Sequence, residues 1–373
     1  MTLSTLRVTE PRELLALVPH QLGFRPVHSV VAVGLRPPRG RVGLVIRVDL
    51  ADLAEGGDGR RLARALVTHL DRDGARRCLL VVYTSDDPRD GSDLRVVDAV
   101  AHFQEAAASA FGDVPVWVVT DRGYLALDCE DSCCPPGGRP LEELEATQVG
   151  AQMVLAGSVV AGTREDVARI RSAGSDARKA VARVRRRWLA RLAGAGSDEA
   201  LERWRLDSVR AWRRAVTDAA DGGVPVGASA LGRLEAGLTD TRVRDAVLVA
   251  LVPGTGTLPE RSVLGARTSP DADAALADAL ALVVDPRAGV RPPTGATRVH
   301  ERVLERVVAH GERQRQAPAL TLLALLAWWR GDGARAQLLL ARALQCDPAH
   351  RLARLIDTAV AQGVPPGWVR AER

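Results

Sequence analysis

The stretch SVVAVGLRPPRGRVGLVIRVDL, residues 29–50, contains two apolar, β-branched runs on either side of the sequence RPPRG. In the second run apolar residues occupy every second position from Val42 to Leu50, which is the period of a strand with one buried face. The prolines and the glycine between the runs favour a turn. We therefore predict a β-hairpin and a sheet that extends outward from it.

The segments after the hairpin alternate between helical and strand patterns. Residues 59–74 carry leucines at four-residue spacing and residues 94–111 are amphipathic, whereas CLLVVY (78–83) and VPVWVV (114–119) are short apolar runs. Such alternation is typical of an α/β domain with right-handed crossovers. For residues 1–163 we predict an α/β domain with a mixed, partly parallel sheet, at least two parallel strand pairs and flanking helices.

Strand patterns fade beyond Arg164, and amphipathic helical patterns separated by glycine-rich breaks replace them. We predict an all-α region with a helical domain at 164–290, whose first helix is basic, and a helical end at 291–373. Residues 317–363 read as helix, Gly-Asp-Gly turn, helix, Asp-Pro break, helix. This end resembles a tetratricopeptide unit, although only about one and a half units fit and a solenoid needs about three.

Composition limits the classes of protein that the chain can belong to. Hydrophobic residues make up 46% and aromatic residues 3%, so the cores must consist mainly of Leu, Val and Ala. The N-terminus lacks the basic and apolar regions of a signal peptide, and no apolar run approaches the ~18 residues of a membrane span. We expect a cytoplasmic protein that uses no membrane and keeps its five cysteines free or metal-bound.

Four segments, 14–35, 40–50, 129–138 and 241–251, together resemble the bacterial family known as domain of unknown function 4192. LGFRP and CCPP are the most specific parts of the resemblance, which spans most of the chain. The family implies no established activity. The resemblance implies that the following residues occupy positions characteristic of the family: Gly23, Phe24, Arg25, Pro26, Ser29, Cys133, Cys134, Pro135, Pro136 and Gly138.

The loop DCEDSCCPPGG, residues 128–138, holds Cys129, Cys133 and Cys134. Zinc sites usually combine two C-x2-C pairs, and this C-x3-C-C spacing has no second pair nearby, so the three residues are weak zinc candidates. A redox pair of Cys129 with Cys133 or Cys134 is the second alternative, and the neighbouring acids should raise thiol pKa values and oppose it. We favour a structural, proline- and glycine-punctuated loop, and expect no cofactor. If residues 123–127 return as a strand, we expect the loop at the sheet end opposite to the acidic loops 84–90 and 120–123; otherwise we expect it to join them.

Polar loops follow the two strands that should be parallel. Since parallel strands end at one edge of the sheet, where α/β proteins bind ligands, these loops hold the candidates Ser85, Asp86, Asp87, Asp121 and Arg122. No glycine-rich phosphate loop accompanies them. In GFRPVHS, Arg25 is a candidate for binding a carboxylate or phosphate, with His28 and Ser29 beside it; the alternative interpretation is a plain helix-to-strand connection.

The chain has a net charge of +5, and basic residues concentrate between Arg164 and Arg214. An anion or nucleic-acid site would use phosphate contacts from Arg183, Arg185, Arg186, Arg187 and Arg191. Trp188 falls on the apolar stripe of the same helix, and no DNA-reading motif is present, so a solvated basic face is the interpretation we favour.

These patterns contain no complete catalytic constellation. Our first prediction is therefore a non-catalytic protein-interaction or regulatory module with a protein partner. The alternatives are a small-molecule-binding or enzymatic α/β domain that uses the carboxyl edge of the sheet, and an anion or nucleic-acid binder through residues 164–214.

Overall fold

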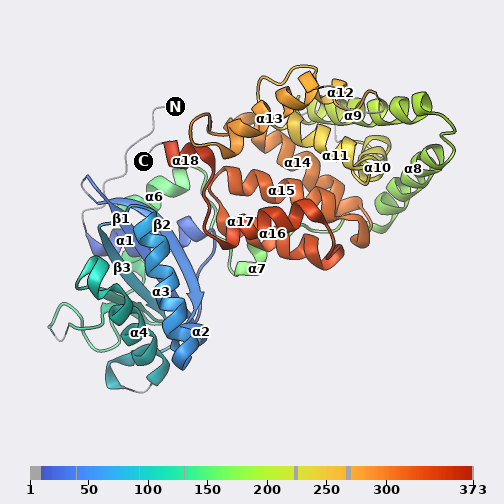
Figure 1. Ribbon diagram of the computed structural model, residues 1–373. Helices are drawn as coiled ribbons and strands as arrows, with labels where there is room; N and C mark the ends of the chain where they lie inside the picture. Colours follow the sequence, from blue (N-terminus) through green and yellow to red (C-terminus); the bar gives the residue numbers. More distant parts are fainter. Residues whose placement is uncertain are drawn as a thin grey trace. The chain divides into compact units, whose positions relative to one another are not determined.

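The computed structural model describes residues 10–38, 40–91, 93–129, 131–221, 226–265 and 270–371. The chain forms two compact units, and the division falls between Val167 and Ala168. The first is a mixed α/β unit and the second consists of helices (Figure 1). This confirms the predicted fold class, whereas the further boundary at residue 290 stays a prediction.

In the described part of the N-terminal unit, six strands form one sheet in the order β2-β1-β3-β4-β5-β6. The strands are β1 (Ser29–Arg36), β2 (Arg41–Asp49), β3 (Arg77–Tyr83), β4 (Val116–Val119), β5 (Gly123–Ala126) and β6 (Arg139–Pro140). The helices of this unit are α1 (Pro11–Leu22), α2 (Leu50–Ala54), α3 (Gly56–Arg72), α4 (Leu94–Phe111), α5 (Glu142–Glu145), α6 (Gln148–Leu155) and α7 (Arg164–Val167), with a 3-10 turn η1 (Pro88–Asp90).

The predicted hairpin is confirmed. β1 pairs antiparallel with β2, with Ser29 opposite Asp49, and the register shifts between Val33 and Leu35. Successive residues of β1 are buried because helices cover both faces of the sheet, whereas β2 lies at the edge of the sheet and is only partly buried. The alternating pattern of β2 therefore reflects its edge position.

The prediction of at least two parallel strand pairs is wrong. Among the described strands only β3 and β4 pair in parallel, whereas β1 pairs antiparallel with both β2 and β3. The strands β2 and β3, which α2 and α3 connect, run in the same direction, but β1 lies between them. The crossover thus skips one strand, and this removes the second parallel pair.

The two faces of the sheet bury different residues. Val82 and Val118 belong to a core that includes side chains of α2, α3 and α4, and these helices cover one face of the sheet in Figure 1. Their neighbours Tyr83 and Val119 point to the opposite face, because side chains alternate along a strand. On that side α1 packs against α5 and α6.

The C-terminal unit consists of helices in its described part. Its longer helices are α8 (Ser175–Ala193), α9 (Asp198–Ala220), α10 (Ala228–Gly237), α11 (Thr241–Ala250), α13 (Pro270–Val284), α14 (Thr294–His310), α15 (Ala317–Trp329), α16 (Gly333–Cys346) and α17 (Arg351–Ala361). The shorter elements are α12 (Leu258–Arg261), η2 (Arg313–Arg315) and α18 (Gly367–Ala371). No helix in the described part of the chain combines the length and the apolar character that crossing a bilayer requires.

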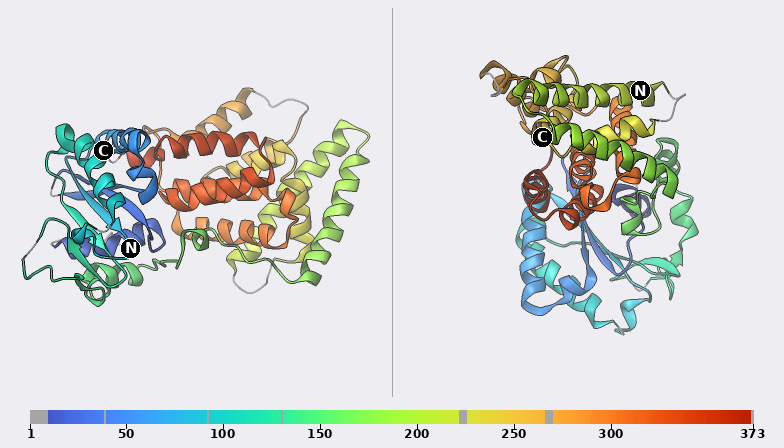
Figure 2. Two further views of the ribbon diagram at one scale, coloured as in Figure 1. Left: turned by 90° about the horizontal axis from the view of Figure 1, so that it is seen from below. Right: turned by 90° about the vertical axis from the view of Figure 1, so that its right-hand side faces the viewer.

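The predicted series of helix, turn, helix, break and helix near the C-terminus is confirmed as α15, α16 and α17. Every described side chain of α15 from Ala319 to Trp329 is buried, since the helix packs against α14, α16 and α17. Figure 2 shows these orange and red helices side by side. Gly331 adopts a φ of 87° in the turn, and the Asp332 side chain then caps α16 by accepting from the Arg335 N–H, as is typical of a helix start.

Candidate functional site

A cavity of about 630 Å³ lies in the N-terminal unit, at the carboxyl ends of β3 and β4. Its walls come from α1, from the connection between α1 and β1, from the ends of the two strands, and from residues 141–160, which include α5 and α6. Small-molecule sites in proteins commonly measure ~300–1,000 Å³ and occur at this edge of α/β sheets. The cavity therefore has both the size and the place of a ligand site.

Parallel pairing of β3 with β4 brings two predicted candidates together. The Thr84 N–H donates to the Val119 carbonyl over 3.1 Å, and the Asp121 N–H to the Ser85 carbonyl over 3.4 Å. The two segments thus continue side by side beyond the strands. As a result Ser85 and Asp121 line the same cavity.

Arg25 reaches the cavity from the opposite wall. Gly23 ends α1 with a φ of 78° and donates its N–H to the Pro19 carbonyl, so the chain turns sharply toward β1. Arg25 then donates to a carboxylate oxygen of Glu145 over 2.9 Å, and both side chains are about two-thirds exposed. An exposed ion pair of this kind contributes at most ~1 kcal/mol, which leaves the guanidinium available to a ligand.

His28 follows at the rim, with a φ of 45°. A positive φ is uncommon for a residue with a Cβ and marks local backbone strain. The His28 carbonyl accepts a hydrogen bond from the N–H of Leu50 over 2.9 Å. This bond anchors the strained residue to the start of α2.

Tyr83 is a polar lining residue that the sequence patterns did not indicate as a site candidate. Its side chain is 7% exposed, and its hydroxyl is buried without a hydrogen-bond partner among the described residues. Burial raises the pKa of this phenol, so it stays protonated and able to donate. Its position could have indicated a role in the site, because Tyr83 is the last residue of the predicted strand CLLVVY and directly precedes the polar loop.

His20 was missed for a different reason. It lies in α1, and its Nδ1 is 3.0 Å from the Ser158 hydroxyl, 138 positions further along the chain. Burial first, and then the charge of Arg25, lower the pKa of His20. The ring is therefore neutral at physiological pH, and no local pattern in the sequence indicated that α1 would form a wall of the cavity.

The remaining candidates of this group lie outside the cavity lining in the described residues. Ser29 is buried, donates to the Val27 carbonyl and accepts from Arg47. Asp87 is held by Arg89, whose hydrogen bonds lower the pKa of that carboxyl. Asp86 and Arg122 are exposed.

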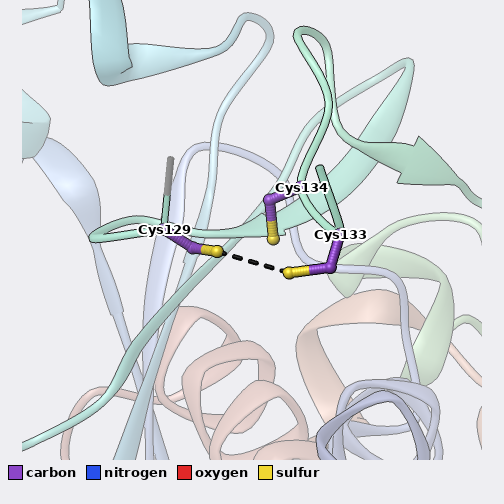
Figure 3. A group of neighbouring side chains, drawn as sticks. All are labelled: Cys129, Cys133 and Cys134. Atoms are coloured by element: carbon purple, nitrogen blue, oxygen red, sulfur yellow. Dashed lines mark hydrogen bonds between the residues drawn. The ribbon is translucent and has the colours of Figure 1, made fainter. Parts of the chain in front are cut away.

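The loop with three cysteines is a second cluster of chemical groups. The Sγ atoms of Cys129, Cys133 and Cys134 all lie within 4.8 Å of one another, and those of Cys129 and Cys133 are 3.4 Å apart (Figure 3). All three are free thiols. Cys134 is 5% exposed and packs in the same core as Cys78. Its side chain therefore fills part of the core in addition to placing a thiol beside those of Cys129 and Cys133.

The predicted separation of this loop from the acidic loops is wrong. Residues 123–126 do return as a strand, β5, but the loop then runs back to β6 at the opposite end of β5. There Asp87 accepts from the Gly137 N–H over 3.2 Å. Two features bring the cysteine loop and loop 84–90 together. The strand β5 is short, and the long Arg89 side chain reaches the carbonyls of Cys129 and Cys134.

The charge of Asp131 raises the pKa of Cys129, as predicted for the acidic residues, but the net shift of this pKa is downward. The Asp131 backbone N–H, followed by hydrogen bonds from the other two cysteines, lowers the pKa of Cys129, and the Asp131 charge is the smallest influence. The hydrogen bond to Cys129 raises the pKa of Cys133 to about 11. Local hydrogen bonds thus outweigh the charge of the neighbouring acid.

The basic helix of the sequence is α8. Arg183, Arg186, Arg187 and Arg191 are exposed on it, whereas Arg185 is buried. Arg185 donates to Glu235 over 2.7 Å and pairs with Glu312 at 2.9 Å, which removes it from the anion candidates. Trp188 is buried, as predicted, and the Arg191 guanidinium lies 4.5 Å from its ring centre.

Comparison with known proteins gives one result. No curated protein and no solved structure matches the chain. The model of one protein family, described as a domain of unknown function (DUF4192), matches residues 11–367. This range includes both the cavity and the cysteine loop, and the chain therefore belongs to the DUF4192 family.

Proposed function

We propose that the N-terminal unit binds a small organic molecule in the cavity at the carboxyl ends of β3 and β4. The observation that carries this proposal is the cavity of about 630 Å³, which Tyr83 lines. The hydroxyl of this residue is buried and has no hydrogen-bond partner among the described residues. A buried hydroxyl that makes no hydrogen bond costs about 1–3 kcal/mol. A ligand that accepts from Tyr83 recovers that free energy.

The rest of the lining defines the chemical class of ligand. Leu15, Leu144 and Val119 supply apolar wall, which suits a ligand with an apolar body. Arg25 and the neutral His20 supply polar contacts on the side of α1. A carboxylic acid with an apolar body fits this combination, since its carboxylate competes with the exposed Glu145 for Arg25.

Thermal unfolding tests the proposal. The unfolding temperature of the full-length protein is measured with each member of a library of small carboxylic acids, nucleotides and other metabolites. A ligand at about a hundred times its dissociation constant adds about 2.7 kcal/mol of stability. For each compound that raises the unfolding temperature, the dissociation constant is then measured by calorimetry.

Two substitutions in α6 provide a matched pair. Val154 lines the mouth of the cavity and is 63% exposed, whereas its neighbour Leu155 is 86% exposed and is not a lining residue. Val154→Trp should narrow the mouth and weaken binding by about tenfold or more, which is about 1.4 kcal/mol, while Leu155→Trp should leave it unchanged. Equal affinities of both variants, or a library that contains no stabilising carboxylic acid, contradict the proposal.

The other roles inferred from the sequence stay predictions. A regulatory or interaction module with a protein partner is compatible with this proposal, because such a module can bind a ligand without catalysing a reaction. The cytoplasmic location remains a prediction from the sequence. For the anion or nucleic-acid role, four of the five arginines are exposed on α8. Nucleic-acid binding that does not weaken with added salt contradicts the phosphate-contact form of that role.

A further inference from the structure

The three sulfur atoms of the cysteine loop point toward one common space (Figure 3). Each pair of Sγ atoms lies within 4.8 Å, and the shortest pair, Cys129 and Cys133, is 3.4 Å apart. A tetrahedral zinc ion with Zn–S bonds of about 2.3 Å holds its sulfurs about 3.8 Å apart. The Cys129–Cys133 separation, 3.4 Å, is shorter than this value, and the other two do not exceed 4.8 Å, so small side-chain rotations would bring the three sulfurs to the spacing that such an ion imposes.

The backbone around the sulfurs is held in place from outside the loop. Arg89 donates to the carbonyls of Cys129, Cys134 and Pro135 at distances of 2.9–3.0 Å, and Asp87 in turn pairs with Arg89 at 2.6 Å. Outer partners that orient ligand-bearing segments are typical of metal sites. The Arg89 contacts fix the positions of the ligand residues before any ion arrives.

The buried member of the triangle is tied to the sheet. Cys134 is 5% exposed, and its Sγ accepts a hydrogen bond from the Ala126 N–H of β5 over 3.5 Å. Cys133 is exposed, so the triangle has one buried and one solvent-facing corner. No His or carboxylate among the described residues joins the three sulfurs within 4.8 Å, so these residues leave the fourth position of a tetrahedral site open.

We propose that Cys129, Cys133 and Cys134 bind one Zn²⁺ ion, with a water molecule or another exchangeable ligand in the fourth position. Three protein ligands and one open position distinguish such a site from closed structural zinc sites. The C-x3-C-C spacing needs no second cysteine pair in this arrangement. The site is independent of the cavity proposed to bind a small molecule.

Metal analysis of the full-length protein tests the site. The protein is purified under reducing conditions, stripped with a chelator, incubated with Zn²⁺ and desalted, and its zinc content is measured by mass spectrometry. We expect about one Zn²⁺ per chain. Co²⁺ should give the intense thiolate-to-cobalt absorption and the visible bands of a tetrahedral site, and Zn²⁺ should remove them.

Cysteine variants distinguish this site from zinc bound elsewhere. Cys129→Ser, Cys133→Ser and Cys134→Ser should each lose the bound ion, whereas Cys346→Ser, in α16, should keep it. Because Cys134 is buried, its variant is compared with wild type by circular dichroism; the exposed Cys133 gives the test that is least sensitive to folding. Zinc retained by Cys133→Ser overturns the proposal. So does a protein that is isolated with a Cys129–Cys133 disulfide and takes up no zinc once that disulfide has been reduced. Uptake of Cu⁺ but not Zn²⁺ also overturns it.

Discussion

A guanidinium nitrogen of Arg185 lies 2.7 Å from a carboxylate oxygen of Glu235, and the two side chains are only 10% and 2% exposed. Glu235 also accepts from the Glu312 N–H over 2.7 Å, so the pair joins α8, α10 and the segment after α14. Removing one partner leaves an uncompensated buried charge.

We expect Arg185→Ala to destabilise the protein by about 3–5 kcal/mol. Arg186→Ala, an exposed position on the same helix, should change stability by no more than about 0.5 kcal/mol. Urea unfolding followed by circular dichroism measures both. Similar losses in the two variants would mean that the charge of α8, and not the buried pair, governs stability.

Gly232 in α10 packs closely against α8. A Cβ at this position would lie 2.6 Å from the Val184 Cβ and 2.7 Å from the Val181 carbonyl oxygen. Gly232→Ala should therefore destabilise by about 1–3 kcal/mol, even though alanine favours helix. Gly295→Ala in α14, where nothing lies within 4 Å, should be neutral or stabilising in the same unfolding assay.

His300 makes the stability of the C-terminal unit depend on pH. Burial first, and then the charge of Arg213, lower the pKa of His300 from 6.5 to about 4. Between these values the unfolded chain binds a proton that the folded chain does not, so stability falls as the pH is lowered through this window. At 1.36 kcal/mol per pKa unit the loss is about 3 kcal/mol.

His300→Gln isolates this contribution. Unfolding free energies are measured for wild type and variant at about pH 7 and about pH 4. Wild type should lose about 3 kcal/mol more than the variant between the two conditions. Equal losses would show that other groups account for the acid sensitivity, such as Asp87, whose hydrogen bonds with Arg89 lower its pKa.

Tyr83→Phe removes the hydroxyl that has no partner among the described residues. In the ligand-free protein this should leave stability unchanged or raise it by about 1 kcal/mol, because no hydrogen bond is lost and a buried polar group is gone. Thermal unfolding checks this. Destabilisation comparable to that of Tyr124→Phe, whose hydroxyl donates to Glu143 over 2.8 Å, would show that the Tyr83 hydroxyl has a partner.

Arg89→Gln should loosen the cysteine loop. The side chain donates to three loop carbonyls, and glutamine is too short and has too few donors to replace them. We expect the buried Cys134 to react with a thiol reagent about tenfold faster in metal-free protein, consistent with the effects of outer-shell changes. Arg95→Gln, whose guanidinium contacts only Asp93 among the described residues, is the control. Equal rates in wild type and both variants would mean that the β5 contact alone holds Cys134.

Most of the N-terminal elements could be predicted because their patterns are local. The hairpin, β3, α4 and β4 follow from apolar periodicity within a few turns or strands, and parallel pairing of β3 with β4 was enough to place Ser85 and Asp121 at one edge. The pairing of β1 with β3 could not be predicted in this way, because the residue pattern of a strand does not specify which other strand pairs with it.

The candidate sites divide along the same line. Local sequence is enough to show that three cysteines share a short loop, that polar residues follow β3 and β4, and that α8 is basic. The packing of the folded chain adds three features that the sequence does not show. α1 and α6 form walls of the cavity that Tyr83 lines, Arg89 reaches the cysteine loop, and Arg185 is buried among carboxylates. These outcomes depend on contacts between residues tens of positions apart, and such contacts depend on how the elements pack and not on local patterns of residues.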